Sequence, residues 1–244
     1  MNISEMLELN ERAKEEGKLY PKARYLFTEI QSELGKHFIG IVGPRGVGKT
    51  VILKQLVVSE PDTFYLSADT LDESDLYQVA RILSDQYKIK TLLVDEIHFC
   101  KTYPKDLKKI YDFLRIRLVF SSSVSLSLFE TAYDLSRRVL LRLLYPFSFR
   151  EYLSFIKNVE IPPISIGDIS NDQWTTDHMR FSYLFDQYVK GGIFPFALGE
   201  PDPLPLLEKI CLKTIRTDIP MAVSYTHLTL PTNRVAGGGG GGGG

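Results

Sequence analysis

The residues best suited to chemistry form one glycine-rich stretch, residues 43–50. It reads Gly43, Pro44, Arg45, Gly46, Val47, Gly48, Lys49 and Thr50, which fits the phosphate-binding pattern G-x-x-x-x-G-K-[ST]. Glycines let backbone N–H groups approach phosphate oxygens, and a helix that follows adds its positive N-terminal dipole. Lys49 would then contact the β- and γ-phosphates, and the Thr50 hydroxyl would be a ligand of Mg²⁺. The stretch predicts a nucleotide-binding site; the alternative is an ordinary glycine-rich turn between a strand and a helix.

A second stretch supplies two carboxylates. The apolar run 91–94 ends in Asp95 and Glu96, as a buried parallel strand does when it delivers charge to the ligand edge of an α/β sheet. Asp95 is predicted to help bind Mg²⁺, either as a direct ligand or through a hydrogen bond to one of its ligands. Glu96 is predicted to orient and activate an attacking water. Acidic residues often end strands, so the pair alone is weak evidence for a functional site. It becomes strong evidence because the glycine-rich stretch precedes it.

A third candidate group is a run of hydroxyls. Residues 117–120 are expected to form a strand that ends in Ser121, Ser122 and Ser123. At the carboxyl end of a strand these side chains would point to the same crevice, where Ser122 or Ser123 could sense the γ-phosphate through a hydrogen bond. The alternative is that the serines cap the next helix.

The elements that must position these residues follow from hydrophobic periodicity. Strands are predicted at 37–42, 63–68, 91–95, 117–120 and 139–143, and the helices between or after them at 49–59, 76–83, 105–114 and 127–133. Strands that alternate with helices imply an α/β fold with a doubly wound parallel sheet.

The rest of the chain is expected to be helical. Amphipathic patterns at 3–16 and 22–34 predict an N-terminal helical cap, residues 1–35, ahead of a core at 36–158. Ser148 with Glu151 three residues later predicts a capping box at the start of a helix. A polar loop at 159–177 is then the expected boundary of a small helical lid, residues 159–222, with helices at 180–189 and 205–215.

The end of the chain has a different character. Residues 237–244 are all glycine, and residues 223–232 can be back-translated as GTC TCT TAT ACA CAT CTG ACG CTG CCG ACG, which is similar to the transposase adapter of sequencing libraries. We therefore expect 223–244 to be a non-native, disordered tail and the natural chain to be truncated near Ala222. A genuine flexible linker is the alternative.

Composition narrows the class of protein. The 244 residues carry a formal net charge of −1, so no global field favours nucleic acid or an anionic membrane. The two cysteines, Cys100 and Cys211, lie far apart, which favours a reducing compartment. No run approaches the roughly 18 apolar residues of a membrane helix, so we expect a cytoplasmic protein without a membrane partner.

Taken together, the motifs resemble the AAA+ superfamily of P-loop ATPases, and more narrowly the predicted prokaryotic ATPases that carry a further C-terminal domain. The stretches that carry the resemblance are 43–50, 94–98, 120–123, 137–138, 145–152 and 191–195. The resemblance implies ATP and Mg²⁺ as cofactors, adenine rather than guanine as the base, and the roles given above for Lys49, Thr50, Asp95 and Glu96. It also places the serine run where the family has its sensor residue.

The chain departs from that family in three places. Ser122 and Ser123 stand where relatives usually have Gly-Ser, and Arg137 and Arg138 stand where they have Gly-Arg. Arg138 therefore matches an arginine that could act as a finger on a nucleotide, in cis or from a neighbouring subunit; the alternative is a surface arginine that pairs with acids. The lid contains no convincing second sensor arginine.

These observations lead to an expected activity. We expect an Mg²⁺-dependent ATPase domain that hydrolyses ATP to ADP and phosphate, in a possible homo-oligomer, coupled to a change in a later domain or in an unknown protein or DNA partner. The alternative is a nucleotide-gated switch that binds DNA or protein and turns over little. A small-molecule kinase would need an acceptor pocket and a mobile basic lid, for which the sequence gives no sign.

Overall fold

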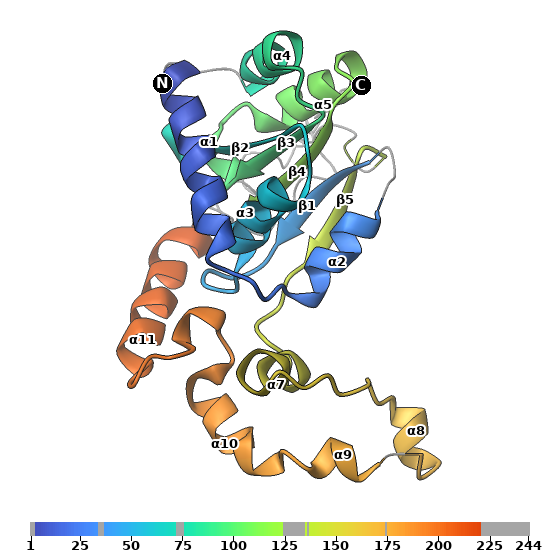
Figure 1. Cartoon of the computed structure of the whole chain (residues 1–244). Coiled ribbons are helices and arrows are strands. Elements are labelled where there is room, and N and C mark those ends of the chain that lie inside the picture. The colour runs from blue at the N-terminus through green and yellow to red at the C-terminus, as the bar shows by residue number, and fades with distance from the viewer. Residues whose placement is uncertain are drawn as a thin grey trace, which may run out of the picture.

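A five-stranded parallel sheet forms the centre of the molecule (Figure 1). The computed structural model describes residues 3–33, 37–71, 76–123, 135, 137–173 and 175–220. Within these residues the strands are β1 (Phe38–Val42), β2 (Thr63–Ser67), β3 (Thr91–Asp95), β4 (Arg117–Ser122) and β5 (Val139–Leu143). Their order is β2-β3-β4-β1-β5, and every neighbouring pair is parallel. The predicted strands and the doubly wound α/β class are confirmed.

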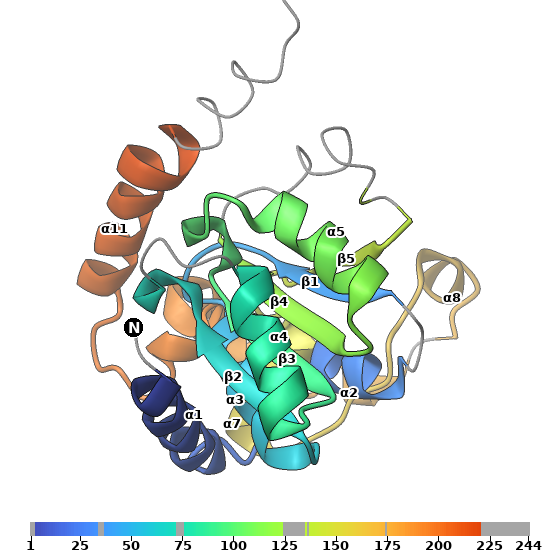
Figure 2. The same cartoon turned by 90° about the horizontal axis from the view of Figure 1, so that it is seen from above.

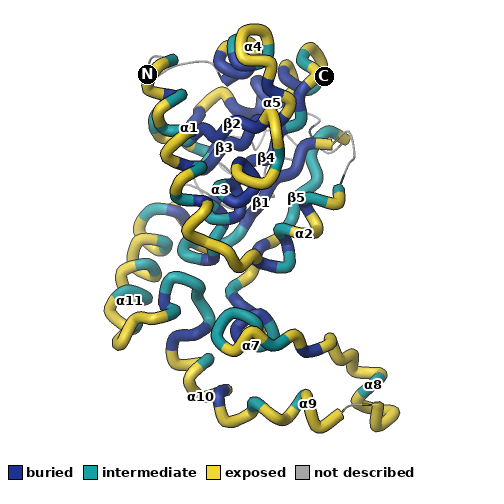
Figure 3. Tube along the Cα trace, viewed as in Figure 1, coloured by how far each residue is buried: buried dark blue, intermediate teal, exposed yellow. Residues whose placement is uncertain are grey.

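Helices cover both faces of this sheet (Figure 2). On one face α4 (Leu76–Tyr87) and α5 (Tyr103–Phe113) pack on the even-numbered core positions of β1 to β4. On the other face α3 (Lys49–Ser59), α2 (Tyr25–Ser32) and Ala13 of α1 (Ile3–Lys18) pack on the odd-numbered positions, while Met6 near the start of α1 belongs to the first cluster. Because successive strand side chains point to opposite faces, a strand covered on both sides must be apolar throughout, which is why β1 to β4 are almost wholly buried (Figure 3).

The two N-terminal helices belong to this layered core. The Asn10 amide oxygen in α1 accepts a 2.8 Å hydrogen bond from the Tyr65 N–H of edge strand β2. Gly17 brings α1 so close to α3 that an added Cβ would lie 2.2 Å from the Lys54 carbonyl oxygen. The two predicted helices thus lie beside α3, in the helical layer on that face of the sheet.

Below the sheet in Figure 1 lies a helical lid. It contains α7 (Phe149–Lys157), α8 (Ile166–Ser170), α9 (Thr176–Met179), α10 (Phe185–Gln187) and α11 (Leu204–Lys213). The predicted capping box of α7 is present, since Ser148 and Glu151 bond each other's backbone N–H groups. Side chains of α7 share a small core with Ile161 and Leu184. This small core therefore contains residues from both sides of the boundary expected at 158.

The lid also differs locally from the sequence expectation. The segment expected to be a loop contains α8, because Ser165 and Asp168 form a capping box of their own. The single helix expected at 180–189 is instead a 3₁₀ turn Ser182–Leu184, then α10, then a π-helical turn Tyr188–Gly192. The helix expected at 205–215 is confirmed as α11. The helix expected at 127–133 and the tail at 223–244 lie outside the described residues.

None of the described helices is both long and apolar enough to cross a membrane.

The close approach of α1 to α3 makes a prediction about stability. Gly17→Ala should lower the free energy of unfolding by about 1–3 kcal/mol, because the new methyl group meets backbone that cannot move without repacking. Gly167→Ala in α8 is the matched control, since its added Cβ finds only Ser165 Oγ at 3.5 Å and should be neutral or stabilising. Urea unfolding of both variants measures the difference, and equal midpoints would show that the α1–α3 contact is not tight.

Candidate nucleotide-binding and hydrolysis site

The glycine-rich stretch forms the loop that joins β1 to α3. Gly46 has φ +80° and Gly48 has φ +97°, in the left-handed region that favours glycine. Gly48 is the residue before the first turn of α3, so the helix N-terminus faces the loop. Free N–H groups at a helix N-terminus beside a glycine loop can form an anion-binding cradle, which is the arrangement that the predicted phosphate loop requires.

Lys49 lies at the centre of this loop. Its side chain is 5% exposed, and Nζ donates hydrogen bonds of 2.9 Å to the carbonyl oxygens of Gly43 and Pro44. Burial lowers the pKa of Lys49, while the nearby carboxylates of Glu96 and Asp95 act to raise it. The amine is therefore held over the loop within the field of both acids.

The strand order brings the acids to the loop. Strand β4 lies between β1 and β3, with Val42 opposite Ser122 and Val94 opposite Phe120. The Gly43 N–H reaches the Ser122 carbonyl oxygen at 3.4 Å. The carboxyl ends of β1, β4 and β3 thus form one row, in which the serine run stands between the phosphate loop and the acids.

Asp95 is fixed by two hydroxyls. Its carboxylate is 4% exposed; Oδ2 accepts a 2.9 Å hydrogen bond from Tyr65 Oη, and Oδ1 accepts one from Ser121 Oγ. Ser121 Oγ also accepts the Glu96 N–H at 2.9 Å. Burial, with Asp95 as the next cause, raises the pKa of Tyr65 and keeps it a hydrogen-bond donor. Sequence reasoning missed Tyr65, because only the strand order places β2 beside β3.

Glu96 is turned toward the end of β4. Its backbone is left-handed, with φ +49°, which is uncommon for a residue with a side chain and tends to mark functional sites. Glu96 Oε2 accepts the Ser123 N–H at 3.0 Å and lies 3.3 Å from His98 Nδ1. The same nitrogen is 3.1 Å from Ser122 Oγ. Burial lowers the pKa of His98, so the imidazole beside Glu96 favours its neutral form.

Two candidate arginines lie in different places. Arg45, in the loop, makes a bidentate pair with Asp218 of the lid, with both distances 2.8 Å. Arg138 precedes β5 at the amino end of the sheet and pairs with Asp112 of α5 at 3.0 Å. Since β1 has five residues at ~3.3 Å each, about 16 Å of strand separates that end from the loop. The structure does not bring Arg138 to the site of its own chain.

The residues fit a magnesium nucleotide. Mg²⁺ keeps most of its ligands as water and phosphate oxygens and needs only one or two oxygens from the protein. Thr50, in the first turn of α3, and Asp95, at the end of β3, would supply such oxygens.

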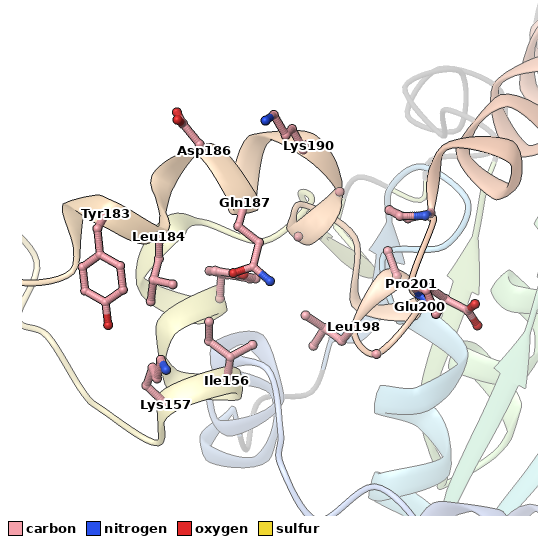
Figure 4. A pocket seen from close by; sticks show the side chains of 16 residues that line it. Ile156, Lys157, Tyr183, Leu184, Asp186, Gln187, Lys190, Leu198, Glu200 and Pro201 are labelled. Carbon is pink, nitrogen blue, oxygen red and sulfur yellow. The ribbon is translucent and has the colours of Figure 1, made fainter.

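A separate hollow lies in the lid. It has a volume of about 750 Å³ and is bounded by α7 and by the segments 183–192 and 197–203. Ile156, Leu184, Gln187 and Leu198 face into it, while Asp186 and Lys190 point away (Figure 4). None of the predicted site residues lines it, so it is distinct from the phosphate loop.

Known proteins resemble this chain over its sheet domain. Residues 35–153 match a family model described as "AAA domain", a stretch that includes the loop and the strand-end acids. MJ1637, an uncharacterized protein of Methanocaldococcus jannaschii, is 32% identical over 197 residues, which are 72% of this chain and 41% of that protein. This chain thus spans less than half the length of that relative.

Among solved structures, the Thermotoga maritima RuvB Holliday junction branch migration motor aligns with a TM-score of 0.35 and 17% identity, over 62% of this chain and 52% of that one. A similarity of this size does not support an argument about the fold, which the strands themselves show. The parallel sheet and the loop after β1 define a P-loop α/β fold, and residues 35–153 of it are similar to the AAA domain.

The bridge made by Ser121 can be tested directly. Ser121→Ala should lower the free energy of unfolding by about 1–3 kcal/mol, because the buried Asp95 carboxylate and the Glu96 N–H each lose a partner. Ser59→Ala is the control: its hydroxyl also bonds a backbone carbonyl and a side chain, but on the surface, and should change little. Equal unfolding curves for the two variants would show that the bridge carries no energy.

Proposed function

We propose that the chain is an ATP-binding, Mg²⁺-dependent ATPase domain that hydrolyses ATP to ADP and phosphate. The observation that carries this proposal is the strand order, which brings the loop with the buried Lys49 and the acids Asp95 and Glu96 at the end of β3 to one edge of the sheet. A phosphate cradle alone would bind a nucleotide. Two carboxylates beside it add a metal ligand and a group that can orient water.

Each residue then has a role. The loop amides and Lys49 would hold the β- and γ-phosphates, and Thr50 and Asp95 would hold Mg²⁺, whose charge would neutralise the developing negative charge. Glu96 orients the attacking water, and its link to the Ser123 N–H fixes the direction of the carboxylate. Ser122 and Ser123 would report the γ-phosphate to His98 and Glu96. Arg138 could reach a nucleotide only on a neighbouring copy of the chain.

The proposed preference for adenine rests on the family resemblance, and the proposed cytoplasmic location rests on the cysteine content and the lack of a membrane-length apolar run in the sequence. A homo-oligomer and a DNA or protein partner are further proposals.

Phosphate release from Mg²⁺-ATP tests the enzyme. Lys49→Ala should weaken ATP binding by at least about tenfold, since it removes a charged hydrogen-bond donor. Glu96→Gln should still bind ATP but turn over about 10²-fold or more slowly, because the amide cannot act as a base. Lys209→Ala, on the exposed face of α11, should leave both quantities unchanged.

The same assay distinguishes further outcomes. Turnover that rises faster than linearly with protein concentration would support a site shared between copies. Tight ATP binding without phosphate release, unaffected by Glu96→Gln, would contradict hydrolysis by this chain.

One observation favours a second function, a nucleotide-gated switch. The lid touches the phosphate loop, because Asp218 is 5% exposed and pairs with Arg45. Phe196 packs so closely on Gly46 that an added Cβ would lie 2.8 Å from its ring. A phosphate in the loop would attract Arg45 and repel Asp218. Nucleotide binding would then bias the position of the lid, which is the requirement for a switch.

Removal of that carboxylate tests the switch. Asp218→Asn should tighten ATP binding by about fivefold or more, in the range of typical couplings between sites, since Arg45 is released and a like charge is gone. Glu208→Gln, on the exposed side of α11, is the matched control and should bind as the wild type does. Fluorescent-nucleotide titration measures both, and unchanged or weaker binding by Asp218→Asn would exclude a competing role for the carboxylate.

A further inference from the structure

Arg24 is a buried arginine outside every motif of the sequence. It directly precedes α2, and its side chain is 6% exposed. Its guanidinium forms a bidentate pair with Glu151 of α7, with Nε to Oε1 at 2.7 Å and Nη2 to Oε2 at 2.9 Å. These two residues lie 127 positions apart in the chain, so only the tertiary structure joins them.

The remaining donors of Arg24 reach the backbone around the phosphate loop. Nη1 donates a 2.6 Å hydrogen bond to the carbonyl oxygen of Val47, within the loop itself. Nη2 donates at 2.9 Å to the Tyr145 carbonyl oxygen, just after β5. The guanidinium carbon lies 4.6 Å from the centre of the Phe147 ring. One side chain therefore ties the loop to the start of the lid.

The bond to Val47 fixes the direction of a loop peptide. In a trans peptide the C=O and the following N–H point to opposite sides of one plane. With the Val47 oxygen held by Arg24, the N–H of Gly48 is directed away from Arg24. Gly48 is the residue before the first turn of α3, where an inward N–H binds phosphate and an inward carbonyl oxygen would repel it.

The charge of Arg24 is already matched. Glu151 neutralises it in a buried pair, and Glu151 is itself held by the N–H groups of Tyr25 and Ser148 at 3.3 and 3.4 Å. A buried, bidentate, fully bonded arginine keeps one geometry. Arg24 thus has the properties of a rigid brace and not those of a phosphate ligand.

We propose that Arg24 is a positioning residue of the phosphate site: it holds the Val47 carbonyl outward so that the Gly48 N–H faces the bound phosphate. Glu151 in turn holds Arg24, which makes the shape of the loop depend on the position of α7. The inference rests on the proposed function, because the phosphate is that of the nucleotide.

Calorimetric titration with Mg²⁺-ATP and with pyrophosphate tests this role. Pyrophosphate has no base or sugar, so it reports on the cradle alone. Arg24→Lys keeps the charge but loses the fork that spans Glu151 and Val47; its Kd for both ligands should rise by about 10- to 100-fold, as expected for a hydrogen bond to a charged group. Arg117→Lys is the matched control, since Arg117 pairs with Glu60 and bonds the Ile30 carbonyl oxygen at 2.7 Å at the amino end of β4, whereas the loop lies at the carboxyl end of the sheet.

A double variant separates positioning from stability. Arg24→Met with Glu151→Leu removes both charges, so no unpaired charge is buried and the fold should survive. If Arg24 positions the loop, this variant melts near the wild-type temperature yet binds pyrophosphate as weakly as Arg24→Lys. In ¹⁵N-glycine-labelled protein, the Gly48 amide signal should also move in both variants and stay in place in Arg117→Lys.

The outcomes distinguish the proposed nucleotide-binding function from the positioning role of Arg24. Wild-type protein that binds neither ATP nor pyrophosphate would overturn the proposed function and this inference with it. Wild-type binding that both Arg24 variants retain at the strength of Arg117→Lys would overturn the inference alone. The same holds if the double variant recovers wild-type affinity, because Arg24 would then serve only to neutralise Glu151.

Discussion

The strand order β3-β4-β1 is the constraint on which the candidate site depends. Parallel strands present their carboxyl ends at one edge, and the order places the serine run of β4 between the phosphate loop after β1 and the acids after β3. Ser121 then links Asp95 to the Glu96 backbone, and Ser123 holds the Glu96 side chain. A different neighbour for β1 would leave the same residues in the chain with no common site.

The phosphate loop is also connected to distant parts of the chain through two arginines. Arg24 reaches Val47 from the N-terminal segment and joins it to α7, while Arg45 reaches out of the loop to Asp218 in the lid. The first contact is buried and fully neutralised, which suits a fixed brace. The second places a carboxylate where a phosphate would compete for the arginine, which suits a contact that changes. Both contacts make the shape of the loop depend on the lid: the Arg24 contact because it supports the loop, and the Arg45 contact because a phosphate would compete with Asp218.

The lid is less securely packed than the sheet. The strands and the helices on them are buried over most of their length, whereas α8, α9 and α11 have no buried residue (Figure 3). Motion of an element costs least where few apolar contacts must be broken. The contacts of the lid with the loop, through Asp218 and Phe196, are therefore well placed to respond to a ligand. The proposed hydrolysis could in this way change the position of the lid.

The sequence by itself determined the elements and the chemistry of the motifs. Short apolar runs bounded by turn residues predicted the strands. The spacing of Gly43 to Thr50 predicted a phosphate loop, because glycine readily adopts the positive φ that Gly46 and Gly48 have. The tertiary structure decided which side chains meet. The partners of Asp95, Arg24 and Arg45 come from β2, α7 and the lid, 30, 127 and 173 residues away, and it set Arg138 at the far edge of the sheet. Periodicity reports how a segment faces the core, but strand order and lid packing arise from contacts between segments, which no local pattern encodes.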